Sequence, residues 1–331
     1  MQEYGYISRL KREMKGKYSD EYINKCVEYA ANLLHQNLPV IFDQRHLKEI
    51  LNLYRIKPDC YHTFAIAGKG KMRIINAPSM PIKVRQQWVL KEILEKREVH
   101  PCCHGFVKGK SILTNAKMHM GSKEILNMDI KDFFPSINFP LIINIYLQMG
   151  YGREAAEALA MLCCHEGQLP QGAPTSPYLA NLVLRDMDNR LNCFCSRENI
   201  IYTRYADDMT FSGNVPLEKF INEFRKIISS YSFQVNEEKT RVYKEPYRKM
   251  VTGLIVKEDR ICIPKKFKRL LKQEIYYCQK NGVTQHLKNT GNADRVNFKE
   301  YLYGKAYYIK MVEPVIGDKL LNDLDSIAWE Y

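Results

Sequence analysis

The feature that most constrains the fold of this chain is the run from Ile200 to Ser212, which has two adjacent carboxylates at its centre. On both sides of Asp207 and Asp208, β-branched and aromatic residues recur with a rough period of two, which predicts two short strands joined by a turn at the aspartates. Two neighbouring carboxylates at a hairpin tip repel one another, and a divalent cation would relieve that repulsion. A solvated Asp-Asp turn without a metal is the alternative explanation.

A second apolar run ends in a third aspartate. Residues 124–130 predict a strand with Asp129 near its end. If this strand lies beside the hairpin, three carboxylates meet at one point. Hard oxygen ligands in that number suit two Mg²⁺ ions about 3.5–4 Å apart, an arrangement that promotes in-line phosphoryl transfer. The sequence therefore predicts a site for two Mg²⁺ ions at Asp129, Asp207 and Asp208.

The order and spacing of these aspartates resemble the palm of a reverse transcriptase, where one aspartate precedes a Tyr-Ala-Asp-Asp hairpin. The stretch Leu169-Pro-Gln-Gly-Ala-Pro-Thr-Ser-Pro177 is similar to the family motif that packs against the nascent base pair. Two further stretches, Asn115-Ala-Lys-Met-His119 and Val251-Thr-Gly253, resemble marks of the retron reverse transcriptases. The resemblance covers residues 40–315 and implies an α+β, right-hand polymerase fold with fingers, a palm with an antiparallel sheet, and a helical thumb.

The resemblance also implies roles for individual residues. Lys239 would approach the leaving pyrophosphate, and Phe134 would lie beneath the incoming sugar, where its ring excludes a 2′-hydroxyl. The metal ligands would be Asp129, Ile130, Asp207 and Asp208. The contacts to the incoming deoxynucleotide would be Lys71, Arg73, Phe134, Gln171 and Tyr205. The RNA-binding residues would be Asn115, His119, Val251, Thr252, Gly253, Lys265, Lys266, Lys268 and Arg269.

Several of these motifs also have a purely structural explanation. Residues 250–256 predict one strand, in which Gly253 would form a β-bulge and Val251 would fill the core. His119 could be an ordinary helix residue. The prolines and hydroxyl residues of 169–177 would make a rigid start for a single long helix that continues to Leu191.

The positive charge of the chain is concentrated near its carboxyl end. The formal net charge is +13, and the stretch from Lys239 to Lys310 contains 18 Lys or Arg against 6 Asp or Glu. Tyrosines are interleaved with these cations, a combination expected for nucleic-acid binding. Basic helices are predicted at about 264–281, 294–312 and 316–328. A solvated basic face with tyrosines in a small core is the alternative.

The rest of the sequence bounds location and organisation. No apolar run approaches a membrane span, the amino terminus lacks a signal-peptide core, and ten cysteines fit free thiols in a reducing cytoplasm, so we expect a cytoplasmic protein without a membrane partner. Two Cys-Cys-His triplets, at 102–104 and 163–165, lack zinc-site spacing and predict buried thiols. The expected domains are 1–55, an N-terminal helical extension; 56–125, fingers; 126–256, palm with part of the fingers; and 257–331, basic helical thumb.

The sequence therefore predicts an RNA-directed DNA polymerase that uses deoxynucleotides and a cognate structured non-coding RNA. Likeness to retrons implies that synthesis starts from a guanosine 2′-hydroxyl and yields a branched RNA–DNA product, msDNA. It also implies a role in anti-phage defence with a separately encoded effector protein. The alternatives are a reverse transcriptase of the group II intron or abortive-infection type, a DNA-templated polymerase, and a non-catalytic RNA-binding protein.

Overall fold

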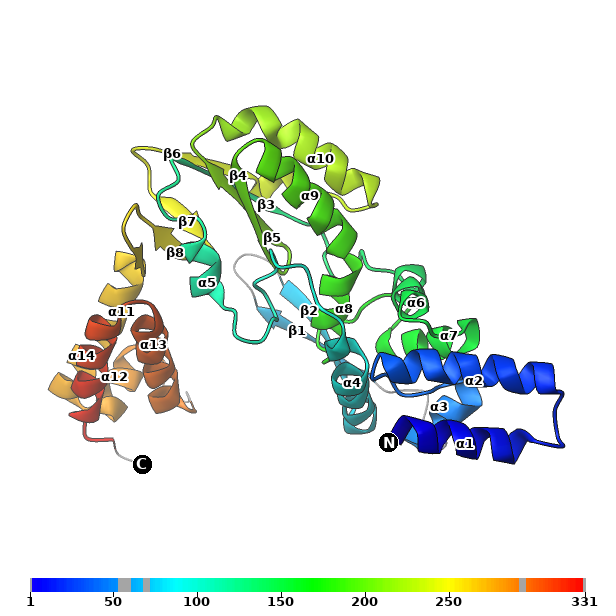
Figure 1. The fold of residues 1–331 in the computed structure, drawn as a ribbon. Helices are drawn as coiled ribbons and strands as arrows, with labels where there is room; N and C mark the ends of the chain where they lie inside the picture. Colours follow the sequence, from blue (N-terminus) through cyan, green and yellow to red (C-terminus); the bar gives the residue numbers. More distant parts are fainter. Residues whose placement is uncertain (1, 53–60, 68–71, 292–295, 330–331) are drawn as a thin grey trace. The chain divides into compact units, whose positions relative to one another are not determined.

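The computed structural model (Figure 1) describes residues 2–52, 61–67, 72–291 and 296–329. The chain divides into two compact units. The first unit comprises Met1–Val107, Ile130–Arg190 and Ile227–Gln234, and the second comprises Lys108–Asp129, Leu191–Lys226 and Val235–Tyr331. Both units combine helices with antiparallel strands, as expected for the α+β class.

The first unit is mainly helical. Two of its helices begin at the caps that their sequences favour: the Ser19 side chain accepts a hydrogen bond from the Tyr22 amide, and the Asp43 side chain accepts one from the His46 amide. Helix α7 contributes four alanines and packs against α3, α4 and α6. The helices are α1 (Gln2–Met14), α2 (Asp20–His35), α3 (Gln44–Leu51), α4 (Met80–Glu92), α6 (Phe139–Gln148), α7 (Arg153–Cys163) and α8 (Ser176–Val183).

The first unit also contains two paired strands. Strand β1 (Tyr61–Ala67) pairs antiparallel with β2 (Met72–Pro78). The single long helix expected after residue 177 is wrong, because the chain breaks at Leu184 between α8 and α9 (Arg185–Arg197). Leu184 is fully buried, so the apolar periodicity continues across the break and conceals it in the sequence.

The second unit is built on a four-stranded antiparallel sheet with the order β4-β5-β3-β6. Its strands are β3 (Glu124–Asp129), β4 (Ile200–Tyr205), β5 (Asp208–Gly213) and β6 (Arg241–Lys244). One face packs through stacked aromatic rings, since Phe211 lies 4.0 Å from Phe224 of α10 (Ile221–Ser230) and 4.9 Å from Tyr202, centroid to centroid. Alternation along β5 places Asp208, Thr210 and Ser212 on the opposite face.

A three-stranded sheet, β7 (Lys249–Val251), β8 (Leu254–Val256) and β9 (Ile261–Cys262), lies beside the short helix α5 (Ile112–Lys117) in the second unit (Figure 1). The predicted single strand over 250–256 is therefore wrong. Thr252 and Gly253 have φ angles of 45° and 81°, and two consecutive left-handed residues close a tight hairpin turn in place of a bulge.

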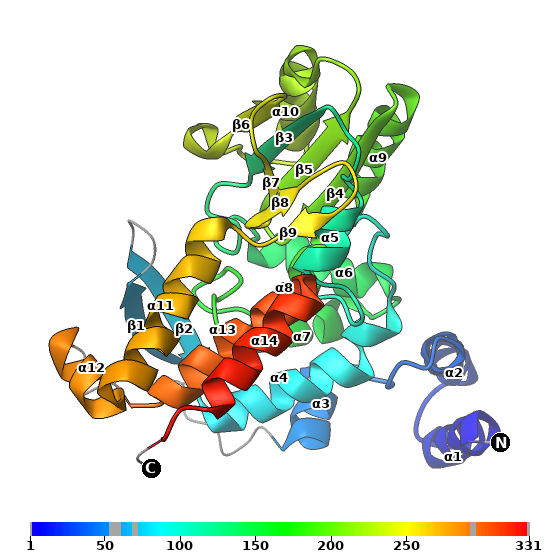
Figure 2. The ribbon, with the colours of Figure 1, turned by 90° about the vertical axis from the view of Figure 1, so that its left-hand side faces the viewer.

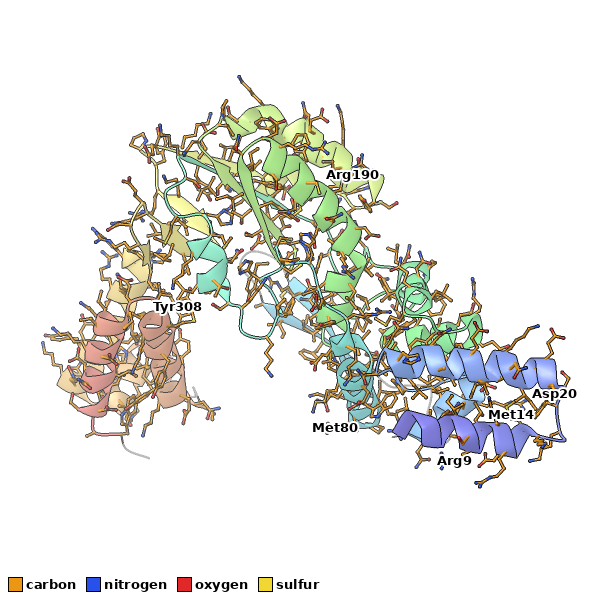
Figure 3. All side chains as sticks on the ribbon, in the orientation of Figure 1. Arg9, Met14, Asp20, Met80, Arg190 and Tyr308 are labelled. Carbon is orange, nitrogen blue, oxygen red and sulfur yellow. The ribbon has the colours of Figure 1, made fainter. Side chains whose placement is uncertain are left out.

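The basic carboxyl-terminal region is helical. Helices α11 (Lys265–Asn281), α13 (Phe298–Val312) and α14 (Pro314–Asp325) contact one another, and α12 (Val283–Asn289) contacts α11 (Figure 2). Their apolar sides share one core with β7, β8 and α5. Tyr308 of α13 packs against Phe267 at 5.3 Å between centroids (Figure 3). No helix among the described residues has both the length and the apolar character needed to cross a membrane.

Candidate active site

A two-residue turn joins β4 to β5 and carries one of the two central aspartates. Tyr205 and Asp208 form the last cross-strand pair, so Ala206 and Asp207 make the turn itself. Ala206 has a φ of 58°, a left-handed conformation that costs an L residue about 1–3 kcal/mol. The buried Arg204 guanidinium donates a hydrogen bond to the Ala206 carbonyl oxygen at 3.0 Å, which helps to hold the turn.

The third aspartate lies on the neighbouring strand. Asp129 is the last residue of β3, and the register of β3 and β5 pairs it directly with Asp208. Directly opposed residues in an antiparallel pair have Cβ atoms about 4.5–5.5 Å apart. The structure thus brings Asp129, Asp207 and Asp208 together at one end of the sheet, with Asp129 only 4% exposed.

This proximity changes the acidity of the carboxyl groups. Burial raises the pKa of Asp207 to about 6, and the charges of Asp129 and Asp208 contribute to the rise. The pKa of Asp208 is also raised, by partial burial and then by the charge of Asp129. Carboxylates that resist ionisation when no cation is bound are stabilised in their charged form when a divalent cation binds.

Lys239 provides the positive charge that faces these groups. It ends the 3₁₀ turn η4 (Glu237–Lys239), and its ammonium lies 2.7 Å and 2.9 Å from the two carboxylate oxygens of Asp129. The segment is held in place because the Asn236 amide donates to the Asp129 carbonyl oxygen at 2.7 Å. Burial works against the charge of Lys239, but the hydrogen bond and charge of Asp129 raise the pKa of the ammonium.

The chemistry of this donor set fits a hard divalent cation. Three carboxylates face one ammonium, and the pKa values of Asp207 and Asp208 are raised, first by burial and then by the neighbouring negative charge. Ile130, the fourth predicted ligand, follows Asp129 in the chain and has a buried side chain, so its carbonyl oxygen is the atom that could bind a metal.

Two of the predicted nucleotide contacts lie on connected segments of the first unit. The Asn76 amide of β2 donates to the Gln171 carbonyl oxygen at 2.9 Å, which ties the Gln171 loop to the strand that carries the exposed Arg73. Gly172 makes this contact possible, because a Cβ at its φ of 136° would meet the Asn76 carbonyl oxygen at 2.9 Å. The predicted contact Lys71 lies outside the described residues.

The adjacent rings Phe133 and Phe134 have different environments in the first unit. Phe133 is 6% exposed and belongs to the core, whereas Phe134 is only partly buried and meets Phe133 edge to face at 5.1 Å. Phe134 can therefore present a face to a ligand, and Phe133 cannot. The last predicted nucleotide contact, Tyr205, is partly exposed in the second unit and belongs to the last residue pair before the aspartate turn.

The predicted RNA-binding residues all lie in the second unit, but they differ in how far their side chains are exposed to solvent. The side chains of Asn115, His119 and Val251 are fully buried and cannot touch RNA directly. Lys268 is 18% exposed and pairs with Glu313 at 2.8 Å. Those that lie on the surface, wholly or in part, are Thr252, Gly253, Lys265, Lys266 and Arg269.

Sequence reasoning missed an open groove in the second unit, of about 1010 Å³, between the three-stranded sheet and the ends of α11 and α13. Tyr247, 75% exposed, lies on its wall. The signal was the run of charged and aromatic residues at 243–249. The cationic lining residues are Arg248, Lys249, Lys257, Arg260, Lys265 and Lys268.

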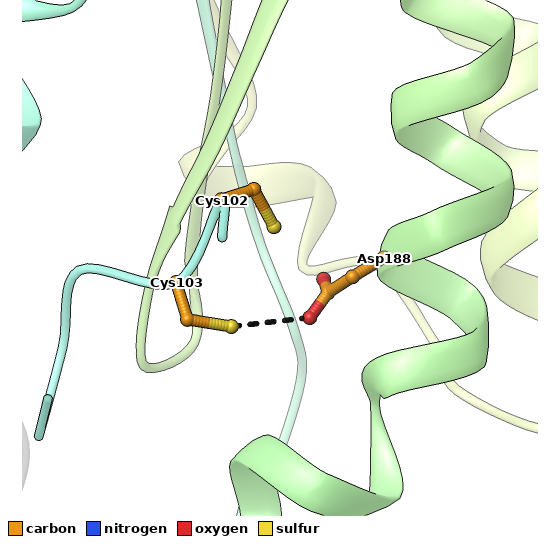
Figure 4. A group of neighbouring side chains, drawn as sticks. All are labelled: Cys102, Cys103 and Asp188. Carbon is orange, nitrogen blue, oxygen red and sulfur yellow. Dashed lines mark hydrogen bonds between the residues drawn. The ribbon is translucent and has the colours of Figure 1, made fainter. Parts of the chain in front are cut away.

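Among the described residues of the first unit, Cys102, Cys103 and Asp188 form a buried group whose candidate metal-binding atoms lie within 4.8 Å of one another (Figure 4). The Cys103 Sγ lies 3.3 Å from an Asp188 carboxylate oxygen, and a thiol that donates to a carboxylate explains this contact without a metal. The prediction of buried thiols is confirmed for Cys102, Cys103 and Cys163, while Cys164 is partly exposed.

Comparison with known proteins gives a consistent set of similarities. Residues 56–270 match the family model described as reverse transcriptase (RNA-dependent DNA polymerase). The Ec86 retron reverse transcriptase of Escherichia coli is 35% identical over 69% of this chain and 73% of its own length. The Mx65 retron reverse transcriptase of Myxococcus xanthus is 33% identical over 78% of this chain, which spans 63% of that relative. A solved structure of telomerase from Candida albicans has a TM-score of 0.46 at 12% identity, over 82% of this chain and 64% of that one.

Proposed function

Because this chain belongs to the retron reverse transcriptases, a family of RNA-directed DNA polymerases with a right-hand fold, we propose that it copies one cognate structured non-coding RNA into DNA. The observation that carries the proposal is the register that pairs Asp129 with Asp208 beside the Asp207 turn. In the hand, residues 1–55 are an N-terminal extension, 56–125 the fingers, 126–256 the palm with part of the fingers, and 257–331 the thumb.

In this proposal the three aspartates, with the Ile130 carbonyl oxygen, hold two Mg²⁺ ions. When bound, the ions supply charge that activates the attacking hydroxyl and stabilises the leaving pyrophosphate. Lys239, whose ammonium lies 2.7 Å and 2.9 Å from the Asp129 carboxylate oxygens, would supply positive charge to the leaving pyrophosphate.

In this proposal the nucleotide is selected by the side chains that the family resemblance assigns to it. Phe134 places its ring beneath the sugar, where a 2′-hydroxyl would collide with it. Gln171 and Tyr205 contact the nucleotide, while Arg73 and Lys71 bind the triphosphate. The tie between Gln171 and Asn76 means that the Gln171 loop and the Arg73 strand move together as the nucleotide binds.

The cognate RNA is bound by the basic second unit. Lys265, Lys266 and Arg269 are exposed cations on α11, placed to neutralise phosphates. The exposed turn at Thr252 and Gly253 reads the shape of the RNA. Following the family, synthesis starts from a guanosine 2′-hydroxyl of that RNA, the product is a branched msDNA, and the chain acts in anti-phage defence with a separate effector.

The proposal is tested with the chain purified together with its RNA. Incubation with deoxynucleotides and Mg²⁺ should yield DNA that remains attached to RNA after denaturation and is released by a debranching enzyme. Asp208→Asn should abolish synthesis while RNA still co-purifies, whereas Asp186→Asn, an exposed carboxylate on α9, should leave synthesis intact. Near wild-type synthesis by Asp208→Asn would reject the catalytic assignment. Unbranched DNA would reject the priming mechanism alone.

A further inference from the structure

The buried His119 connects two elements of the second unit. It lies two residues beyond the end of α5 and is fully buried. Its Nδ1 lies 2.7 Å from the Ser212 hydroxyl, and its Nε2 lies 2.7 Å from the Thr203 hydroxyl, so both ring nitrogens are within hydrogen-bond distance of the sheet. The Ser122 hydroxyl adds a further bond to Ser212 at 3.0 Å.

These two hydroxyls belong to the two strands of the aspartate hairpin. Thr203 is on β4 and Ser212 is on β5, and the imidazole therefore bridges the strand pair. Strand β4 lies at the sheet edge and pairs only with β5 among the described strands. Alternation along β5 puts Ser212 on the same face as Asp208, four residues along the strand from it. The bridge thus restrains sliding of β4 against β5 on the face that carries the carboxylate.

The other end of α5 is anchored as well. A capping box formed by Ser111 and Thr114 fixes its first turn. The Thr252 hydroxyl donates to the Ile112 carbonyl oxygen at 3.4 Å, and α5 packs against β7, β8 and β9. On the same sheet face, the Asn127 side chain donates to the Met250 carbonyl oxygen at 2.9 Å.

We propose that His119 is a positioning residue for the aspartate hairpin: with α5, it holds β4 and β5 in the register that places Asp208 against Asp129. This inference rests on the proposed polymerase function but assigns His119 a different task from RNA contact. The hairpin needs such a restraint because its turn contains a left-handed alanine and its outer strand, β4, pairs with β5 alone among the strands that the structure describes. An error of about 1 Å in the position of a catalytic group can cost about 10²-fold in rate.

The test measures metal binding separately from activity. In His119→Ala, Mn²⁺ affinity measured by electron paramagnetic resonance should fall about tenfold, because the carboxylates are no longer held together. With a supplied primer–template, kcat should fall at least tenfold, while the KM for deoxynucleotide and the Kd for RNA stay within twofold. His119→Gln, which retains a hydrogen-bonding group, should recover part of both losses.

The matched control is His286→Ala, which removes another buried histidine of the second unit, hydrogen-bonded to Glu274 at 2.6 Å in the helical region. It should lower Tm without changing Mn²⁺ affinity. The proposal is overturned if His119→Ala lowers Tm as His286→Ala does but binds Mn²⁺ and turns over like the wild type. If His119→Ala does not fold, Thr203→Val and Ser212→Ala are measured instead, and unchanged Mn²⁺ affinity in both overturns the proposal.

These outcomes separate the inference from the function on which it rests. A wild type that binds Mn²⁺ but makes no DNA rejects the proposed function, and weaker Mn²⁺ binding in His119→Ala would still support the positioning role. A wild type that makes DNA together with an unaffected His119→Ala rejects the positioning role alone.

Discussion

Asp207 sits in a turn where its charged form is disfavoured, and this links the stability of the protein to pH. Its pKa rises from 3.8 to about 6 on folding, so the folded state binds the proton more tightly than the unfolded state. The stabilising contribution of this proton is complete below pH 4 and is lost as the pH rises through 6. Above pH 6 and without metal, the aspartate therefore destabilises the fold.

We predict that Asp207→Asn makes the metal-free protein more stable than the wild type at pH 7.5, by about 1 kcal/mol once solvent screening is allowed for. The difference should shrink at pH 5, and Mg²⁺ should raise the Tm of the wild type more than that of the variant. Thermal unfolding at both pH values, with and without Mg²⁺, measures this. Asp186→Asn serves as the control, and equal Tm values for wild type and Asp207→Asn at pH 7.5 would contradict the prediction.

The two phenylalanines at 133 and 134 should behave differently when they are truncated. Phe134→Ala should raise ribonucleotide incorporation relative to deoxynucleotide by at least tenfold, because the volume that excludes the 2′-hydroxyl disappears. Phe133→Ala should instead lower stability by about 3 kcal/mol, since Phe133 is a buried core side chain. Single-nucleotide incorporation and thermal unfolding of both variants separate the roles. Unchanged sugar selectivity in Phe134→Ala would place that residue with the core.

At the scale of residues, the carboxylates were readable from the sequence because charged side chains interrupt otherwise apolar strands. The conformation of Ala206 was not, because nothing in an alanine predicts a φ of 58°. Its turn depends on tertiary contacts such as the Arg204 hydrogen bond, whose only sequence signal is an arginine within a buried strand.

Among the elements, the hairpin formed by β7 and β8 is the one that the sequence misrepresents. A run of five apolar residues interrupted by Thr-Gly is compatible with one bulged strand or with two strands and a turn, because both keep the same side chains in the core. In the structure Val251 and Leu254 pair across the turn of a hairpin, and both belong to the core that includes Ala116 of α5. The break at Leu184 was hidden for the same reason, since apolar periodicity reports burial and not continuity.

Because both turn residues are left-handed, we predict that Thr252→Asn stabilises the protein by about 0.5 kcal/mol, since asparagine tolerates that conformation better than a β-branched residue. This gain outweighs the loss of the long hydrogen bond, 3.4 Å, from the Thr252 hydroxyl to the Ile112 carbonyl oxygen. The same change should weaken binding of the cognate RNA at least threefold if the Thr252 side chain contributes to reading it. A higher Tm together with a weaker affinity for RNA would show that Thr252 acts in RNA recognition and not in folding. Extension of a supplied primer–template should be unaffected, and equal loss in self-primed and supplied-primer synthesis would reject the recognition role.

For the whole molecule, net charge predicts that RNA is bound but not which cations do it. Sequence alone treats the cations of α11 as equivalent. The structure separates them, because Lys266 is exposed whereas Lys268 bonds both carboxylate oxygens of Glu313 at 2.8 Å. That pair also positions Ile263, whose amide donates to Glu313 at 2.8 Å, so Lys268 serves the fold of the helical region.

The two lysines therefore make a matched pair for measuring how RNA is held. Each phosphate contact contributes about 0.7–0.9 to the slope of log affinity against log salt concentration, because a condensed counterion is released. Lys266→Gln should lower that slope by about one such step and leave Tm unchanged. Lys268→Gln should leave the slope unchanged and cost about 1–3 kcal/mol of stability, because it leaves the carboxylate of Glu313, 17% exposed, without its cation. The slope is measured from RNA binding at four salt concentrations, and the stability from thermal unfolding, for both variants. If both substitutions lower the slope equally, Lys268 contacts RNA phosphate as Lys266 does, and the prediction that its ion pair with Glu313 keeps it from RNA is wrong.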